Sequence, residues 1–446
     1  MPLSPPLDPK IFAARRAQVL RQMREIAPAG AVAIFPAIPT ATRNSDVEHP
    51  YRADSDLFFL TGFEEPEAVL VLSTKSEKAC TLFVRPRDKE KEIWNGRRAG
   101  TAGAVAQFGA DEAFEVGTLA EKLPALLASA PALFYRLGGV DPEFDARIAK
   151  TLSSLRARAR AGMNAPTRIE DPGPLVHELR LHKSAEEIAA VRKAVELTRR
   201  GHLAAMAAGK PGTHEYDLHG LLEREFRAEG GRGWGYYPIV AAGANATVLH
   251  YNENSMPVRE GALVLIDAGA EVDLYTADVT RTFPASGRFN QAQKAVYQLV
   301  LDAADHCISR TKPGETIEGL HEGAIRVLTE GMVKIGLLKG EVDALIKENS
   351  FRRYYMHRTS HWLGLDVHDV GSYRDNDGKP RALAPGMLFT IEPGLYIAED
   401  DESAPLEYRG IGVRIEDDIL VTQGGHENLT ASIPRTVAEV EQACAR

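Results

Sequence analysis

The chain has 446 residues, of which 44% are hydrophobic and 26% are charged, and its formal net charge at pH 7 is −9. Because this length exceeds what one hydrophobic core usually supports, we expect two globular domains. The acidic balance argues against nucleic acid as a partner, since proteins that bind the phosphate backbone carry a basic excess. No apolar stretch approaches the length of a membrane span, so we also expect no membrane partner.

The first residues and the cysteines bear on the cellular compartment. Residues 1–6 lack the charged and apolar regions of a signal peptide. Cys80, Cys307 and Cys444 are far apart in the sequence and show the spacing of neither a zinc site nor a disulfide framework. We therefore expect reduced thiols and a cytoplasmic protein.

The first third of the chain alternates short apolar runs with helical patterns. Asp8 and Pro9 provide an N-cap and a first-turn proline for a helix. Apolar runs of strand length then follow at residues 31–35, 57–60, 68–72, 81–84 and 132–135. This alternation is typical of an α/β domain. It contains no evident catalytic cluster, but its polar, aromatic loops at 43–52 and 94–98 are candidate contact surfaces.

A change in composition marks the boundary between the domains. Pro166, Pro172, Gly173 and Pro174 crowd together between residues 164 and 174, as is usual in linkers. We therefore predict an N-terminal α/β domain over residues 1–173 and a C-terminal α+β domain over residues 174–446. A capping box at residues 184–187 begins the second domain. Its further expected elements are helices at 216–226, 291–309 and 317–335, followed by short strands between 361 and 421.

Residues 262–283 have the pattern of a β-hairpin, with an apolar run, a polar turn and an alternating return segment. If the turn is centred between Val272 and Asp273, then Asp267 and Asp278 face each other across the hairpin. Carboxylates that close repel each other unless they share a proton or hold a cation. The pair is therefore either a proton-sharing pair or a metal site. The alternative is a solvated hairpin whose aspartates only form the turn.

Four more stretches place ligand-type side chains in strand or loop settings. Each side chain alone is more often a structural residue than a ligand. Together they indicate a functional site, because carboxylates within apolar strands need partners. The candidate residues in these stretches are His250, His357, His361, His368, Glu392, Arg414 and Glu416.

These residues carry a resemblance to a known family. The order of Asp267, Asp278, His361, Glu392 and Glu416 is similar to the five-ligand dinuclear metal site of the pita-bread metallopeptidases. The closer resemblance is to aminopeptidase P, the Xaa-Pro aminopeptidase, and it rests on the motifs at residues 54–63, 93–98, 266–269, 278–284, 357–371, 392–396 and 408–418. One position departs from the family pattern. Arg358 stands where glycine is usual, and a long cation there bears on substrate preference.

The resemblance implies a pita-bread catalytic domain and a metal-dependent aminopeptidase that releases the first residue of peptides with proline second. A hydroxide bridging two divalent ions would attack the scissile carbonyl. The oxygen-rich ligand set favours Mn²⁺, with Co²⁺ or Zn²⁺ as alternatives. By the same resemblance, Glu392 assists as general base, while His250 and His368 stabilise the carbonyl oxygen or orient the substrate. His357 would line the proline subsite, and Arg414 would hold a ligand carboxylate.

The resemblance also implies a homodimer or homotetramer in which the N-terminal domain and a neighbouring subunit limit access to short chains. Trp94 and Asp46 are the candidates for reaching a neighbour's site, and their alternatives are a buried ring and a turn-forming residue. The alternative function is prolidase, which cleaves only Xaa-Pro dipeptides with the same fold and ligands. A non-catalytic binding protein and a metal-free creatinase-type enzyme are disfavoured, because all five ligands are present.

Overall fold

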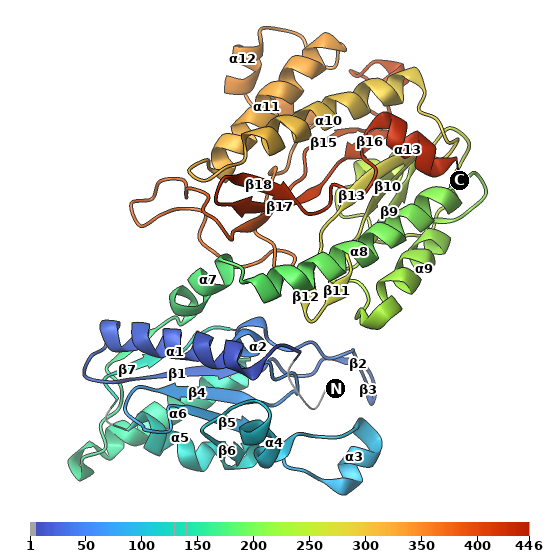
Figure 1. Ribbon diagram of the computed structural model, residues 1–446. Coiled ribbons are helices and arrows are strands. Elements are labelled where there is room, and N and C mark those ends of the chain that lie inside the picture. Colours follow the sequence, from blue (N-terminus) through green and yellow to red (C-terminus); the bar gives the residue numbers. More distant parts are fainter. Residues whose placement is uncertain (1–5, 129, 140, 446) are drawn as a thin grey trace. The chain divides into compact units, whose positions relative to one another are not determined.

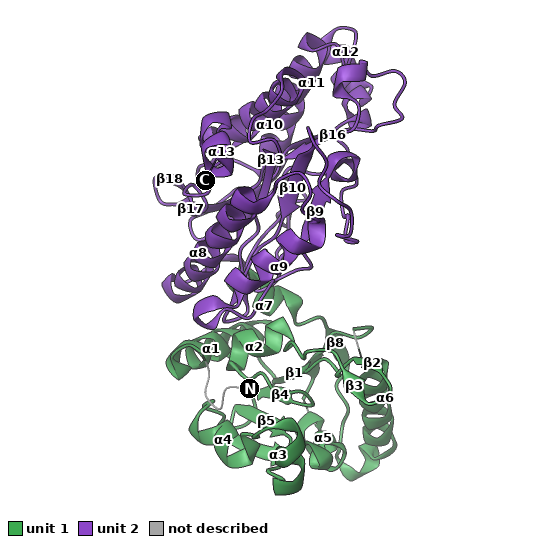
Figure 2. Ribbon diagram, turned by 90° about the vertical axis from the view of Figure 1, so that its right-hand side faces the viewer, with its two compact units in different colours: residues 1–180 green, residues 181–446 purple. Residues whose placement is uncertain are grey.

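The computed structural model describes residues 6–128, 130–139 and 141–445. The chain divides into two compact units, Met1–Arg180 and Leu181–Arg446, which Figure 2 shows in green and purple. Within the described ranges, no helix combines the length and the apolar character needed to cross a bilayer. Cys80, Cys307 and Cys444 are buried free thiols in the structure.

Unit 1 consists of a six-stranded mixed sheet with helices on both faces (Figure 1). Its helices are α1 (Pro9–Ile26), α2 (Ser55–Thr61), α3 (Lys89–Asn95), α4 (Gly100–Ala106), α5 (Leu119–Leu127), α6 (Pro142–Ala157) and α7 (Gly173–Leu181). Its strands are β1 (Ala31–Pro36), β2 (Thr42–Asn44), β3 (Val47–Glu48), β4 (Val69–Ser73), β5 (Cys80–Val84), β6 (Glu112–Glu115), β7 (Ala132–Phe134) and β8 (Arg168–Glu170). The sheet order is β6-β5-β4-β1-β7-β8. On one face, Val71 and Phe83 pack against Leu123 of α5 and Ile148 of α6. The predicted α/β fold is confirmed.

Residues 57–60 form a helix rather than the strand expected from their apolar run. Helix α2 begins after Asp54, whose Oδ1 accepts a hydrogen bond from the backbone N–H of Leu57 at 2.8 Å, and it ends at Gly62, where φ is 67°. Every residue of α2 is buried, so no polar face marks the segment as a helix. The prediction failed because periodicity cannot separate a fully buried helix from a strand.

The compact units divide after Arg180, beyond the proline-rich stretch at which the sequence suggested a boundary. The reason lies in α7. The buried carboxylate of Asp56 accepts a hydrogen bond from Arg180 Nη1 at 2.7 Å and lies 3.1 Å from His177 Nε2. A buried charge with these partners holds α7 to unit 1, so the helix after the prolines still belongs to the first unit.

The two residues expected to reach a neighbouring subunit both lie on the surface of unit 1. Trp94 is 87% exposed on α3, a helix without buried residues, so the buried-ring alternative is wrong. Asp46 is exposed in the turn between β2 and β3, where it also fits the alternative of a turn-forming residue.

Unit 2 consists of small antiparallel sheets with long helices packed against them (Figures 1 and 2). Its helices are α8 (Ala185–Ala208), α9 (Glu215–Phe226), α10 (Gln291–Arg310), α11 (Ile317–Lys334), α12 (Val342–Lys347) and α13 (Val437–Cys444). Its strands are β9 (Ile239–Ala242), β10 (Leu263–Asp267), β11 (Glu271–Val272), β12 (Tyr275–Thr276), β13 (Thr280–Pro284), β14 (Leu388–Ile391), β15 (Gly394–Ile397), β16 (Ile411–Arg414), β17 (Asp417–Thr422) and β18 (Gly425–Asn428). Helix α8 contacts β11 and β12, α9 contacts β9, and α10 contacts β14, β15 and β16. The α+β arrangement agrees with the prediction.

The hairpin at residues 262–283 exists, but its register differs from the predicted one. Strand β10 pairs with β13 so that Asp267 lies opposite Thr280, not Asp278. The tight turn is at Asp273 and Leu274, whose φ values are 52° and 66°, as a two-residue turn of type I′ requires. Sequence reasoning missed this turn because leucine rarely adopts a positive φ. The two aspartates are therefore offset neighbours rather than a directly opposed pair.

Candidate active site

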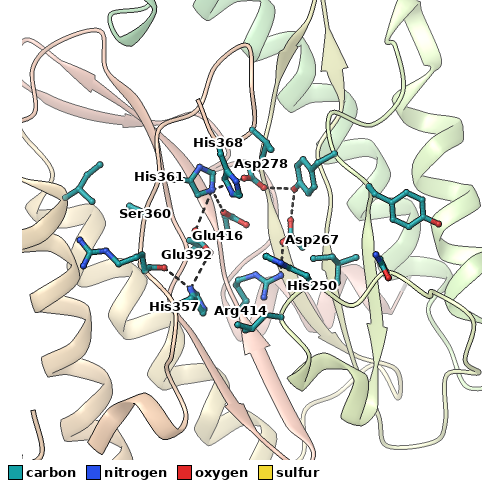
Figure 3. Close-up of a pocket in the computed structure, with 18 of the residues that line it drawn as sticks. His250, Asp267, Asp278, His357, Ser360, His361, His368, Glu392, Arg414 and Glu416 are labelled. Carbon is teal, nitrogen blue, oxygen red and sulfur yellow. Dashed lines mark hydrogen bonds and ion pairs between the residues drawn. The ribbon is translucent and has the colours of Figure 1, made fainter. Parts of the chain in front are cut away.

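A cavity of about 720 Å³ in unit 2 brings the predicted site residues together (Figure 3). Its walls come from segments far apart in the sequence. The residues that line it include every one named from the sequence as a ligand or catalytic group: His250, Asp267, Asp278, His357, His361, His368, Glu392, Arg414 and Glu416. Arg358 also lines this cavity.

The acidic residues all lie where a buried strand ends or begins. Asp267 is the last residue of β10, and Asp278 precedes β13 by two residues. Glu392 directly follows β14, while Glu416 lies between β16 and β17. The apolar strand residues anchor the sheets in the core, so their ends hold the carboxylates rigidly at one end of the cavity.

Asp278, His361 and Glu416 form the tightest part of the site. Each offers a ligand atom, and these atoms lie within 4.8 Å of one another. His361 Nε2 is 3.2 Å from Asp278 Oδ2, 3.6 Å from Glu392 Oε1 and 4.0 Å from Glu416 Oε1. Its other ring nitrogen, Nδ1, lies 3.0 Å from the Trp362 carbonyl oxygen, which can only accept a hydrogen bond. Nδ1 therefore carries the proton, and Nε2 faces the carboxylates.

Asp267 and Asp278 are joined by the hydroxyl of Tyr236. The Tyr236 oxygen lies 2.6 Å from Asp267 Oδ1 and 2.5 Å from Asp278 Oδ1. A phenol has a single proton, so it can donate to only one of the two carboxylates. The other contact requires a proton on the carboxyl group. The two aspartates are therefore linked through one hydroxyl, although they are not paired across the hairpin.

The pKa values of the acidic groups follow from this crowding. Burial raises the pKa of Glu392 to about 7, and it also raises the pKa of Asp267 against the opposing charge of Arg414. Burial and the neighbouring Asp278 raise the pKa of Glu416 well above its usual range. Burial alone would lower the pKa of His361, but the hydrogen bond to Asp278 and the charge of Glu392 raise it to about 9. The site therefore retains protons at pH values at which the isolated side chains would lose them.

Arg414 and Thr280 hold the carboxylates in position. Arg414 Nη2 donates to Asp267 Oδ2 at 2.7 Å, and Nε donates to Thr280 Oγ1 at 3.0 Å. The Thr280 hydroxyl in turn donates to Glu416 Oε2 at 2.6 Å. One chain of hydrogen bonds therefore fixes Asp267 and Glu416 relative to each other.

The three remaining histidines surround the acidic cluster. His357 Nε2 lies 2.8 Å from the Tyr396 hydroxyl, and Nδ1 lies 2.7 Å from the Arg358 carbonyl oxygen. Burial lowers the pKa of His357 to about 3, so this ring is neutral at neutral pH. The ring of His368 meets that of His361 edge to face, with 4.4 Å between centroids. His250 lies on an exposed loop at the cavity wall.

Sequence reasoning missed Tyr236 and Thr280. Thr280 follows Asp278 by two residues, so the alternation of a strand could have placed both side chains on one face. Tyr236 lies in the aromatic stretch of residues 234–237 just before β9, and β9 pairs with β10. Its link to the aspartates depends on this pairing between distant segments, which no local pattern reveals.

A buried glutamate fixes the loop that carries His250. Glu215, the first residue of α9, has an exposed fraction of 0%. Its carboxylate accepts four hydrogen bonds of 2.8–2.9 Å, from the backbone N–H groups of Ala242 and Met256 and from the side chains of Asn245 and Tyr251. One partner directly precedes the loop at residues 243–256, two lie within the loop, and one is its last residue. Glu215 therefore closes this loop at both ends.

Substituting Glu215→Gln is expected to lower the free energy of unfolding by about 2–4 kcal/mol, because the new amide group directs N–H donors at groups that are themselves donors. Urea denaturation followed by circular dichroism measures the change. Glu407, which is exposed in the same unit, gives the matched control, and Glu407→Gln is expected to change stability by less than about 0.5 kcal/mol. Equal stability of both variants would show that the four hydrogen bonds contribute nothing.

Comparison with known proteins identifies the family. Residues 189–423 match the family described as metallopeptidase family M24, and residues 12–135 match the aminopeptidase P N-terminal domain. The chain belongs to metallopeptidase family M24. Its M24 region contains every acidic and histidine residue of the cavity, so the resemblance noted in the sequence is confirmed, together with the pita-bread fold.

Two solved structures and one curated relative show how far the similarity extends. The Xaa-Pro aminopeptidase of Escherichia coli is 45% identical over 432 residues, which cover 96% of both chains. The structure of Pseudomonas aeruginosa aminopeptidase PepP superimposes with a TM-score of 0.95 at 46% identity, over 98% of both chains. A zinc-substituted E. coli aminopeptidase P in complex with product gives a TM-score of 0.94 at 43% identity, also over 98% of both chains. The similarity to these M24 enzymes thus spans both units.

Proposed function

We propose that the protein is a metal-dependent aminopeptidase that releases the N-terminal residue from peptides with proline in the second position. The observation that carries this proposal is the convergence of two buried carboxylates, two partly buried carboxylates and one imidazole in a single cavity. The names of the relatives support the substrate class, since proteins similar along the whole chain are Xaa-Pro aminopeptidases.

The donor set fits two divalent metal ions. Asp267, Asp278, His361, Glu392 and Glu416 are the proposed ligands, and their four negative charges would balance two such ions. The raised pKa values of Asp267, Glu392 and Glu416 and the contacts of the Tyr236 hydroxyl with both Asp267 and Asp278 are what a cation site without its cation is expected to show. Oxygen ligands favour Mn²⁺, with Co²⁺ or Zn²⁺ as alternatives; the zinc-substituted relative shows that zinc enters such a protein.

When bound, the metal ions would supply a water molecule acidic enough to attack a peptide carbonyl near neutral pH. The chain's own residues would do the rest. Glu392, at the cavity end, is proposed to take the proton from the attacking water and carry it to the leaving nitrogen. His250 and His368 are proposed to orient the scissile carbonyl, while Arg414 keeps Asp267 ionised and in place through its 2.7 Å contact.

Selectivity for proline has a chemical basis in the bond itself. An Xaa-Pro bond is a tertiary amide without an N–H group, and the ring fixes the local backbone. His357 is proposed to line the subsite for this ring. A neutral imidazole there suits an apolar ring, because the low pKa of His357 keeps it uncharged.

The remaining expectations concern assembly and location. We propose a homodimer or homotetramer in which Trp94, exposed on α3, and Asp46, exposed in the turn between β2 and β3, contact a neighbouring subunit. A fully exposed indole is costly in water, which supports a partner for Trp94. A cytoplasmic location stays a prediction from the sequence.

The substrate proposal is tested with an Xaa-Pro-Xaa tripeptide and an Xaa-Pro dipeptide, each incubated with the manganese-loaded protein and analysed by mass spectrometry. Release of the first residue from the tripeptide is the expected result. A dipeptide-only enzyme would leave the tripeptide intact, and that outcome would assign the protein to prolidase instead.

A further inference from the structure

Two guanidinium groups line the cavity, and they differ in how they are bound. Arg414 is 5% exposed and uses Nε, Nη1 and Nη2 for Thr280, Tyr396 and Asp267. Arg358 is 59% exposed. Among the described residues, the only hydrogen-bond partner of its guanidinium is Glu318, which accepts from Nη2 at 2.8 Å. Arg358 is thus the cation of the cavity that still has donors for a ligand.

Glu318 holds Arg358 at the cavity wall. It lies in the first turn of α11, and the preceding residue, Ile317, lines the same cavity. The hydrogen bond from Arg358 lowers the pKa of Glu318, so both groups are charged at neutral pH. A guanidinium can bind a second carboxylate through its remaining N–H groups. The ion pair therefore fixes the cation without using up its donors.

The charges of the cavity are separated. The carboxylates of Asp278, Glu392 and Glu416 lie within 4.0 Å of His361, and Asp267 is joined to Asp278 through Tyr236, whereas the Arg358 guanidinium pairs with Glu318 of α11. A short peptide carries an ammonium group at one end and a carboxylate at the other. Its ammonium end is attracted to the acidic cluster, and its carboxylate end is attracted to the Arg358 guanidinium, which keeps unused N–H donors.

We propose that Arg358 binds the C-terminal carboxylate of a short peptide substrate and so makes the enzyme favour peptides that end soon after the proline. This inference rests on the proposed aminopeptidase function. It adds a specificity-determining residue, since the carboxylate of a longer peptide lies about 3.3–3.6 Å further away for every added residue.

The test compares an Xaa-Pro-Ala tripeptide with its C-terminal amide, using the manganese-loaded protein. The native enzyme is expected to cleave the free acid with a kcat/KM about tenfold higher than the amide, as one charge-assisted contact of about 1.4 kcal/mol provides. In Arg358→Gln this preference is expected to vanish through a higher KM for the acid, with cleavage of the amide unchanged. Arg358→Lys should keep part of the preference, because it keeps the charge.

The control is Arg326→Gln. Arg326 is 53% exposed, is paired with Asp343 at 2.9 Å and lies on the same helix, α11, as Glu318, but it does not line the cavity. This variant should retain the tenfold preference. An amidated tripeptide with aspartate in third position separates the two sources of a carboxylate, and it should behave like the plain amide.

Three results would overturn the assignment. They are an unchanged acid preference in Arg358→Gln, an equal loss on acid and amide in that variant, and an Arg358-dependent preference for the aspartate amide. Failure of the proposed function itself would look different, because the native protein would then cleave neither the acid nor the amide.

Discussion

Replacing Glu416 by glutamine is expected to lower kcat by about a thousandfold or more, since a metal centre contributes several kcal/mol of transition-state stabilisation and each 1.4 kcal/mol is a factor of ten. Glu416 is 2% exposed and accepts from Thr280 at 2.6 Å, so the isosteric amide keeps the shape of the site but removes the negative charge of a proposed ligand. The measurements are steady-state cleavage of an Xaa-Pro-Xaa tripeptide and metal content by atomic absorption.

The melting temperature of the metal-free Glu416→Gln variant shows whether its activity is lost because a ligand is missing or because the fold is damaged. The pKa of Glu416 is raised by burial and by the nearby Asp278, which means that its charge is unfavourable in the metal-free site. Glu416→Gln should therefore melt at a higher temperature than the native protein when both are stripped of metal. The same comparison with Asp267→Ala should also show lost activity and lost metal. A variant that binds the full amount of metal and cleaves at the native rate would contradict the ligand assignment.

Metal-free protein is expected to lose stability as the pH rises from about 4.5 to about 9. The pKa of Glu392 is raised to about 7 and that of His361 to about 9, so the folded state binds more protons than the unfolded chain in this range. The stabilisation from Glu392 is fully present below the unfolded value near 4.5 and is lost as the pH passes through 7. It amounts to about 3 kcal/mol. The contribution of His361 is present below about 6.5 and is lost through 9.

Thermal melts of the stripped and the manganese-loaded protein at several pH values measure this effect. Metal competes with protons for the same groups, so the loaded protein should gain stability over the stripped protein as the pH rises. The two curves are expected to diverge between pH 5 and 9. If the melting temperature of the stripped protein rose over this pH range, ionisation of the acidic cluster would not destabilise the metal-free fold, and the prediction would be wrong.

The sequence predicted most elements because their signals are local. The capping box at Ser184 and Glu187 is present at the start of α8, and helices α10 and α11 begin where the pattern placed them. Asp267 and Glu392 were found because each follows an apolar run, and the complete set of candidate ligands came from the family resemblance. The sequence was sufficient to predict a feature wherever residues of a single segment determine that feature.

The failures arose where distant segments decide. The hairpin register depends on the positive φ of Asp273 and Leu274, which the turn adopts although leucine disfavours it. Arg414 pairs with Asp267, on a strand far away in the sequence, and no local pattern specified which carboxylate it would hold. Tyr236 joins the two aspartates only because β9 pairs with β10. None of these contacts has a signature within a single segment.

The most direct test of the metal centre is a titration of the stripped protein with Mn²⁺ while the release of the first residue from an Xaa-Pro-Xaa tripeptide is followed. Two divalent ions held by Asp267, Asp278, His361, Glu392 and Glu416 predict that activity is absent without metal and reaches its plateau at two ions per chain. Full cleavage by protein that contains no metal would contradict the proposed centre.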